Sequence, residues 1–313
     1  MKVVVVGASG GVGQSLSLLL KSSLPAQSEL ALYDINENIH GVALDLSHIP
    51  SDVSVAGYAG HDLPKALTGA DIVIIIAGIA RKPGMTRADL LSINANIVGG
   101  IIKAIATHCP KALVGIVTNP VNSLIPAAAA ILRQLGAYDE KKLFGVTALD
   151  QLRTNTFVAQ ELGLAPSTLK IPVIGGHSGQ TILPLLSQAP GAYLSPEAIE
   201  QLNDRIKNAG TAVVEAKAGA GSATLSMAQA AATFTQALVK ALAGESQEVC
   251  AYVANPDMDI EFFARPVLVG PNGIESFVDY GPLSPQEEEE VQNLKAVLRT
   301  DIAEGYDAVA HEG

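Results

Sequence analysis

The chain has 313 residues, of which 48% are hydrophobic and 16% are charged. This length suffices for two domains of ordinary size, and the composition allows a large buried core, so an intrinsically disordered protein is excluded. The formal net charge of −11 at pH 7 argues against nucleic acid and anionic membrane surfaces as general partners. A small anionic substrate is still compatible, because a binding site depends on local charge.

The cysteines and the N-terminal residues indicate a reducing compartment. Cys109 and Cys250 lie far apart, with no C-x-x-C or Cys/His spacing. Neither a disulfide framework nor a structural zinc site is therefore predicted, and we expect no bound metal. The N-terminus shows neither a signal h-region nor an Arg-rich transit segment, and the apolar run 72–77 is too short to span a bilayer. We expect a cytoplasmic protein with no membrane partner.

The first half of the chain alternates between strand-like and helix-like segments. Several strand candidates are continuous β-branched runs, as expected of strands covered on both faces, and helical stretches such as 88–107 and 121–135 separate them. The predicted strands span residues 2–6, 29–33, 53–56, 71–77, 113–118 and 143–146. This alternation predicts an α/β fold, with a Rossmann-type doubly wound parallel sheet over residues 1–146 and the chemistry at the carboxyl ends of its strands.

A glycine-rich turn follows the first predicted strand and precedes a helix. Its members are Gly7, Ala8, Ser9, Gly10, Gly11, Val12 and Gly13. In this context the main-chain N–H groups at the helix start bind a pyrophosphate, and side chains on the glycines would block the approach. Asp34 ends the second predicted strand, where an acid binds the adenosine ribose and repels a 2′-phosphate. We therefore predict a dinucleotide site that takes NAD, although a merely structural turn is the alternative.

The second half, residues 147–313, changes pattern and predicts an α+β substrate or catalytic domain. A helix over 148–162 and a strand over 170–175 come first, followed by long Ala- and Gly-containing helices between 195 and 242. Segments 248–254, 265–269 and 274–279 are typical of antiparallel strands. A capping box at 284–287 opens a final helix.

Residues suited to acid–base chemistry and anion binding follow several predicted strands. Arg81 and Arg87 lie in a Gly/Pro-rich segment, either a solvated basic loop or a lid over an anionic substrate. Asp150 and Arg153 are three residues apart and share one helix face, either as a local ion pair or as site residues. His177 lies among glycines that allow a ligand close approach.

Together these motifs resemble the malate dehydrogenases of the dimeric type found in many bacteria and in mitochondria, which belong with the lactate dehydrogenases. The resemblance runs from residue 1 to about residue 305. It includes the glycine turn, the acid at 34, the segment 80–87, the segment 117–122, the segment 149–153 and the segment 174–179. It implies NAD-dependent oxidation of malate to oxaloacetate in the tricarboxylic acid cycle, and a homodimer.

The resemblance also assigns roles to residues, and acid–base chemistry agrees with them. His177 is the base that takes the hydroxyl proton, and Asp150 orients its ring and stabilises the imidazolium. Arg153 binds the carboxylate beside the reacting carbon, Arg81 binds the distal carboxylate and Arg87 lies near the developing oxyanion. The remaining implied contacts are Asn119 with substrate and cofactor, and Asn94, Val117, Thr118 and Met227 with cofactor.

The alternatives are two other classes of enzyme and a dinucleotide-binding protein without catalytic activity. Tyr138 and Lys142 match the Y-x-x-x-K of short-chain reductases, but their segment leads straight into a strand rather than forming the helix that the motif needs. A lactate dehydrogenase-like 2-hydroxy acid dehydrogenase is expected to carry glutamine where this chain has Arg81. A catalytically silent dinucleotide-binding protein would not need the arginines, the aspartate and the histidine together.

Overall fold

The computed structural model describes residues 1–79, 86–190 and 194–310, and of Arg87 it describes the backbone alone. Its strands are β1 (Lys2–Val6), β2 (Glu29–Asp34), β3 (Ser54–Ala59), β4 (Ile72–Ile75), β5 (Leu113–Ile116), β6 (Leu143–Val146), β7 (Val173–Gly175), β8 (Ile182–Pro184), β9 (Gln247–Ala254), β10 (Phe262–Gly270) and β11 (Gly273–Phe277). Its α-helices are α1 (Gly11–Ser23), α2 (Ile39–Ser47), α3 (Leu63–Leu67), α4 (Arg87–His108), α5 (Val121–Gln134), α6 (Ala148–Leu162), α7 (Pro196–Ala216), α8 (Leu225–Leu242) and α9 (Pro285–Asp307).

Six strands form the parallel part of one mixed sheet, in the order β3-β2-β1-β4-β5-β6. The order reverses between β1 and β4, and in such sheets ligands bind outside the carboxyl ends of the strands at this reversal. The predicted Rossmann-type doubly wound sheet is therefore confirmed. The glycine turn follows β1 and lies at the reversal.

The remaining strands extend the same sheet in antiparallel fashion. β9 pairs with β6, β10 pairs with β9, and β10 also pairs with β7 and β11. The three antiparallel strands predicted near the C-terminus are confirmed. β8 was not predicted, because a strand of three residues that ends in a proline gives too short a pattern. Through β10 and β9, β7 is therefore joined to β6 in the first half of the chain.

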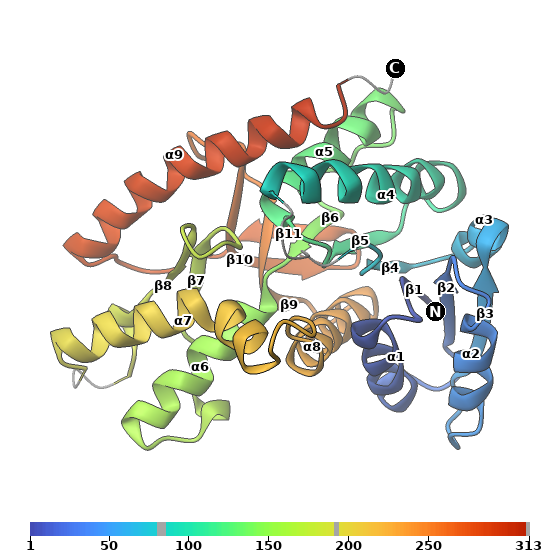
Figure 1. Ribbon diagram of the computed structural model, residues 1–313, viewed down its shortest axis with the longest axis horizontal. Helices are drawn as coiled ribbons and strands as arrows, with labels where there is room; N and C mark the ends of the chain where they lie inside the picture. The colour runs from blue at the N-terminus through green and yellow to red at the C-terminus, as the bar shows by residue number, and fades with distance from the viewer. Residues whose placement is uncertain (80–85, 191–193, 311–313) are drawn as a thin grey trace.

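Helices cover both faces of the sheet, and the alternation of β1 shows why its sequence is apolar after Lys2. Val4 and Val6 pack in the core shared with α4, α5 and α9, whereas Val3 and Val5 pack in the core shared with α1 and α8. Figure 1 shows these two helix layers above and below the sheet. Because both faces are buried, none of positions 3–6 is free to be polar.

Helix α4 is apolar because it belongs to the core. By length and composition, Ala88–His108 is the one stretch among the described helices that could cross a membrane, and half of its most apolar window is buried. Leu91, Ile102 and Ile105 lie in the core shared with α5. Packing against α5 therefore accounts for its composition.

A close contact between α5 and α9 generates a prediction about stability. A Cβ on Gly305 would lie 2.9 Å from the main-chain carbon of Ser123 and still closer to its carbonyl oxygen. Gly305→Ala should therefore force α9 away from α5 and lower the free energy of unfolding by about 1–3 kcal/mol. Gly100→Ala is the matched control, because nothing lies within 4 Å of its Cβ; it should stabilise α4 by about 0.5–1 kcal/mol. Denaturant unfolding of both variants tests this, and equal stabilities would contradict it.

Candidate active site

A histidine and an aspartate from different elements form the centre of the site. Asp150 is in the first turn of α6 and is 1% exposed. His177 follows β7, and its Nδ1 lies 2.6 Å from Asp150 Oδ2. Burial lowers the pKa of His177, but the charge and hydrogen bond of Asp150 outweigh it, so that the pKa is raised. With Nδ1 engaged, Nε2 is the nitrogen left to exchange a proton with a substrate.

A glycine with positive φ aims the histidine. Gly175 ends β7 with φ +99°, and a Cβ there would collide with the carbonyl oxygen of Thr181. Only glycine adopts this conformation without strain. The chain therefore leaves the strand in a sharp turn that carries His177 towards α6.

Arg153 lies on the same helix as Asp150 and interacts electrostatically with the pair. Burial lowers the pKa of the Arg153 guanidinium, while the Asp150 charge raises it, and the net direction is downward. The positive charge of Arg153 in turn lowers the pKa of His177. The structure therefore brings together Asp150, Arg153 and His177, which a sequence pattern alone could only suggest.

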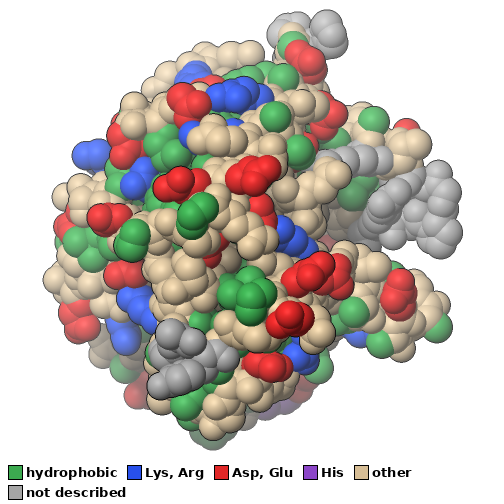
Figure 2. Space-filling model, turned by 90° about the vertical axis from the view of Figure 1, so that its left-hand side faces the viewer, with side chains coloured by type: hydrophobic (Ala, Val, Ile, Leu, Met, Phe, Trp, Pro, Cys, Tyr) green, Lys and Arg blue, Asp and Glu red, His purple; other side chains and the backbone are tan. Residues whose placement is uncertain are grey.

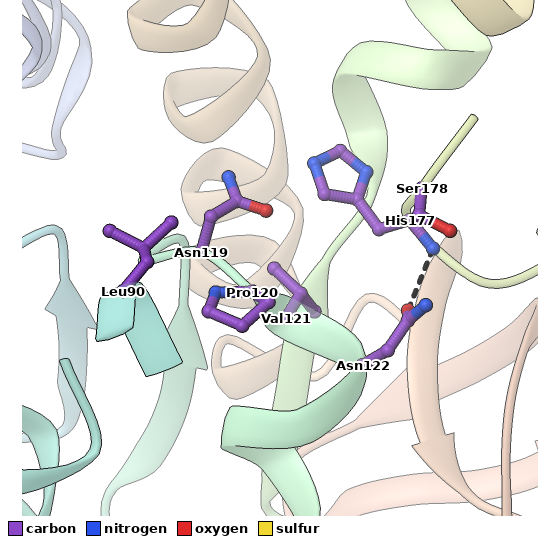
Figure 3. A pocket seen from close by; sticks show the side chains of 7 residues that line it. All are labelled: Leu90, Asn119, Pro120, Val121, Asn122, His177 and Ser178. Carbon is purple, nitrogen blue, oxygen red and sulfur yellow. Dashed lines mark hydrogen bonds between the residues drawn. The ribbon is translucent and has the colours of Figure 1, made fainter. Parts of the chain in front are cut away.

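A cavity of about 200 Å³ adjoins His177. Its lining comes from α4, from the segment after β5 and from the segment after β7, namely Leu90, Asn119, Pro120, Val121, Asn122, His177 and Ser178. Figure 3 shows the His177 ring and the Asn119 amide on the same side of the start of α5. A small molecule in this cavity would therefore contact the predicted base and the predicted amide together.

Asn94 is 0% exposed, and its side chain binds the main chain at Ile79 and at Asn119, of which Asn119 lines the cavity. Its Oδ1 accepts from the Ile79 N–H at 2.9 Å. Its Nδ2 donates to the Ile79 carbonyl at 3.2 Å and to the Asn119 carbonyl at 2.7 Å. These bonds use both N–H donors of the amide, so a positioning function is clear, and the predicted cofactor contact stays a prediction.

The glycine turn has the properties of an anion site. Gly10 caps α1 without a side-chain hydrogen bond, and the first helical turn contains no acidic residue. The N–H groups of that turn are therefore available to a phosphate. Gly7 has φ +93°, and a Cβ on Gly13 would lie 2.6 Å from the Ala8 Cα, so side chains at either position would disrupt the turn. These features fit a dinucleotide pyrophosphate.

Asp34 joins the glycine turn to the end of β2. Its Oδ2 accepts from the Ser9 N–H at 3.0 Å, and its Oδ1 accepts from the main chain of Asn36 at 3.1 Å. The acid is thus oriented before any ligand arrives. It lies where the sequence predicted a ribose contact.

Three other predicted cofactor residues lie near this turn. Thr118 follows β5 and donates from Oγ1 to the Ala77 carbonyl at 2.8 Å. Val117 and Met227 belong to the same buried cluster as Ala8. A Cβ on Gly11 would lie 3.4 Å from Thr224 Cγ2, which places the start of α8 beside the turn. Their contacts with a cofactor remain predictions supported by this placement.

The two arginines of the predicted lid are not placed. Arg81 lies outside the described residues, as does the Arg87 side chain, although its backbone begins α4. The predicted specificity for a dicarboxylate therefore receives no geometric test. Asn122, Thr181 and Asp301 were not singled out, and the structure joins them directly behind His177. Of these three residues, only Asn122 lies in a motif that the sequence analysis used, the segment 117–122. Thr181 and Asp301 lie in none.

Comparisons with known proteins agree with this geometry. Residues 1–145 match the family described as lactate/malate dehydrogenase, NAD binding domain, and residues 147–309 match its alpha/beta C-terminal domain. The malate dehydrogenases of Colwellia psychrerythraea and Photobacterium profundum are each 56% identical to this chain, over 99% of it and 100% of the relative.

Solved structures show the same relationship. Malate dehydrogenase from Cryptosporidium parvum superposes with a TM-score of 0.85 at 28% identity, covering 98% of this chain and 99% of that one. Lactate dehydrogenase from the same organism, complexed with lactic acid and nicotinamide adenine dinucleotide, gives 0.82 at 25% identity, covering 96% of each. Because the two family models match residues 1–145 and 147–309, and relatives at 56% identity cover 99% of it, the chain belongs to the lactate/malate dehydrogenases.

Proposed function

We propose that this protein is an NAD-dependent malate dehydrogenase, which transfers a hydride reversibly between (S)-malate and NAD⁺ to give oxaloacetate and NADH in the tricarboxylic acid cycle. The observation that carries the chemistry is the buried pair of Asp150 and His177, with Oδ2 and Nδ1 2.6 Å apart beside a cavity. The choice of malate is supported by bacterial relatives of that name, which match nearly the full chain at 54–56% identity.

In malate oxidation, His177 Nε2 accepts the proton of the C2 hydroxyl as the C–H bond at C2 breaks. NAD⁺, which the glycine turn and Asp34 would hold, would supply the acceptor for the hydride that leaves that carbon. Asp150 holds the ring in the tautomer that leaves Nε2 free and stabilises the imidazolium once the proton has moved. Arg153 binds the carboxylate next to C2 in bidentate fashion, and Asn119 orients the reacting group. The reverse reaction returns the proton from His177 to the oxygen of oxaloacetate.

The two predicted domains have different roles in this reaction. Residues 1–146 bind the cofactor through the glycine turn and Asp34, and residues 147–313 supply Asp150, Arg153 and His177. Arg81 binds the distal carboxylate and Arg87 the developing oxyanion. The main competitor is a lactate dehydrogenase-like activity, which the same fold supports and which the side chain at position 81 distinguishes.

A small dicarboxylate fits the charge of the protein better than a nucleic acid does. On the face drawn in Figure 2, the described acidic side chains lie among basic and apolar ones rather than beside a continuous basic surface. We also propose a homodimer, which the resemblance to the dimeric malate dehydrogenases supports. A cytoplasmic location is supported by Cys109 and Cys250, which are free, buried thiols.

The first prediction concerns substrate choice. The purified protein should oxidise NADH rapidly with oxaloacetate and slowly with pyruvate, as absorbance of NADH records. Arg81→Gln should lower kcat/KM for oxaloacetate about 10³-fold and raise it for pyruvate, because a buried carboxylate left without its partner is costly. An equal loss with both substrates would remove Arg81 from the specificity role. A wild type that prefers pyruvate would establish the lactate-type activity instead.

A second prediction uses the pH profile. The raised pKa of His177 is held up by Asp150, and the base must be neutral to accept a proton from malate. Asp150→Asn removes that charge, so the acid limb of kcat/KM for malate oxidation should move to lower pH. The rate should fall about 10²–10⁴-fold, because the ring loses its orientation. His108→Asn, on the exposed end of α4, is the matched control and should leave the profile in place. An acid limb that does not move in Asp150→Asn would separate Asp150 from the base.

A third prediction concerns the cofactor. Because Asp34 would repel a 2′-phosphate, kcat/KM should be at least about 10²-fold higher with NADH than with NADPH. Asp34→Ser should narrow this ratio, and Asp204→Ser, in an exposed part of α7, should not. Comparable values for both cofactors in the wild type would refute the role of Asp34.

A further inference from the structure

The amide of Asn122 connects three separate parts of the chain behind the catalytic histidine. Asn122 is the second residue of α5 and is 2% exposed. Its Oδ1 accepts from the His177 main-chain N–H at 2.8 Å, the bond drawn as a dashed line in Figure 3. Its Nδ2 donates to Asp301 Oδ2 on α9 at 2.9 Å and to Thr181 Oγ1 at 3.1 Å.

These partners allow one orientation of the amide. The His177 N–H can only donate, so it requires the oxygen of Asn122. Asp301 lies on the opposite side of the amide and accepts from its nitrogen. Asp301 and Thr181 therefore act on His177 indirectly, because they keep the Asn122 oxygen turned towards it.

The turn that contains His177 is built around the same group. Thr181 Oγ1 accepts from the Ser178 N–H at 3.0 Å, and the Thr181 carbonyl accepts from the Gly176 N–H at 2.9 Å. A Cβ on Gly176 would lie 2.8 Å from Asn122 Oδ1 and 2.7 Å from Thr181 Oγ1. Glycine is therefore required at 176 to let the turn approach the Asn122 amide.

We propose that Asn122 is a positioning residue for His177, oriented by Asp301 and Thr181. His177 is then fixed at two points from two helices: Asp150 on α6 holds the ring, and Asn122 on α5 holds the main chain. If the second point is lost, the main chain shifts while the ring stays tethered, and Nε2 moves away from the substrate. The inference rests on the proposed dehydrogenase activity.

The test compares Asn122→Ala with the wild type in oxaloacetate reduction. Loss of the acceptor should lower kcat about 10²-fold, because a displacement on the order of 1 Å at the reacting group has that effect. KM for oxaloacetate should change little, and the NADH dissociation constant, measured by fluorescence titration, should not change, because the glycine turn and Asp34 are elsewhere. Gly273→Ala is the matched control: its Cβ would collide with the main chain of Lys141, and none of its neighbours is bonded to the Asn122 amide. It should lower thermal stability and preserve kcat.

A reciprocal exchange keeps the test decisive if Asn122→Ala does not fold. Asn122→Asp retains the acceptor for His177 but faces Asp301 without a donor. Combining it with Asp301→Asn restores a donor between α5 and α9, so the double variant should recover kcat about tenfold over Asn122→Asp alone.

Three results would overturn the inference. Asn122→Ala could lose stability with kcat intact, as expected of Gly273→Ala; it could lose NADH affinity in parallel with kcat; or Asn122→Asp could be no less active than the double variant. The proposed function is judged separately, because it stands or falls on the activity of the wild type with oxaloacetate, whereas the inference depends on the ratio of variant to wild type.

Discussion

A carboxylate buried as deeply as that of Asp150 must be compensated locally, because an isolated charge in the interior is unstable. Its Oδ2 lies 2.6 Å from His177 Nδ1, and its Oδ1 has no hydrogen-bond partner among the described residues. Compensation therefore comes from the imidazole and from the nearby charge of Arg153. The contact with His177 that stabilises the carboxylate also raises the pKa of His177. The acid–base chemistry of the site thus follows from one buried charge.

The sheet determines which segments can supply these groups. Parallel strands β1, β4 and β5 deliver their following loops to one edge, where the glycine turn and Asn119 lie. The second half of the chain reaches that edge because β9 pairs with β6 and because β10, next in order, pairs with β7. The glycine turn from one half and the Asp150–His177 pair from the other are therefore carried by one continuous sheet.

The sequence predicted the strands that are apolar throughout, such as β4, and the loops that follow them, because burial on both faces leaves a local pattern. It did not predict β8 or the pairing of β9 with β6, because short strands and partners distant in the chain leave none. The same holds in the site. The glycine turn, Asp150 and His177 carry motifs, whereas Asn122 and Asp301 are 179 residues apart and meet only in the folded chain.

The start of α1 shows how a protein with a net charge of −11 can still have a local site that favours an anion. In helix α9, side chains of the protein itself satisfy the N-terminus: Ser284 and Glu287 form a capping box, and acidic side chains occupy the first turn. Helix α7 is capped by the Ser195 side chain. Helix α1 starts at Gly11 after an uncapped glycine and has no acid in its first turn. Its positive end is therefore left uncompensated by the chain, which is unfavourable in isolation and favourable once a phosphate binds there. Helices α2, α5 and α8 also begin without a side-chain cap or a first-turn acid. What distinguishes α1 is therefore the glycine turn before it, which lets a phosphate approach the main chain closely.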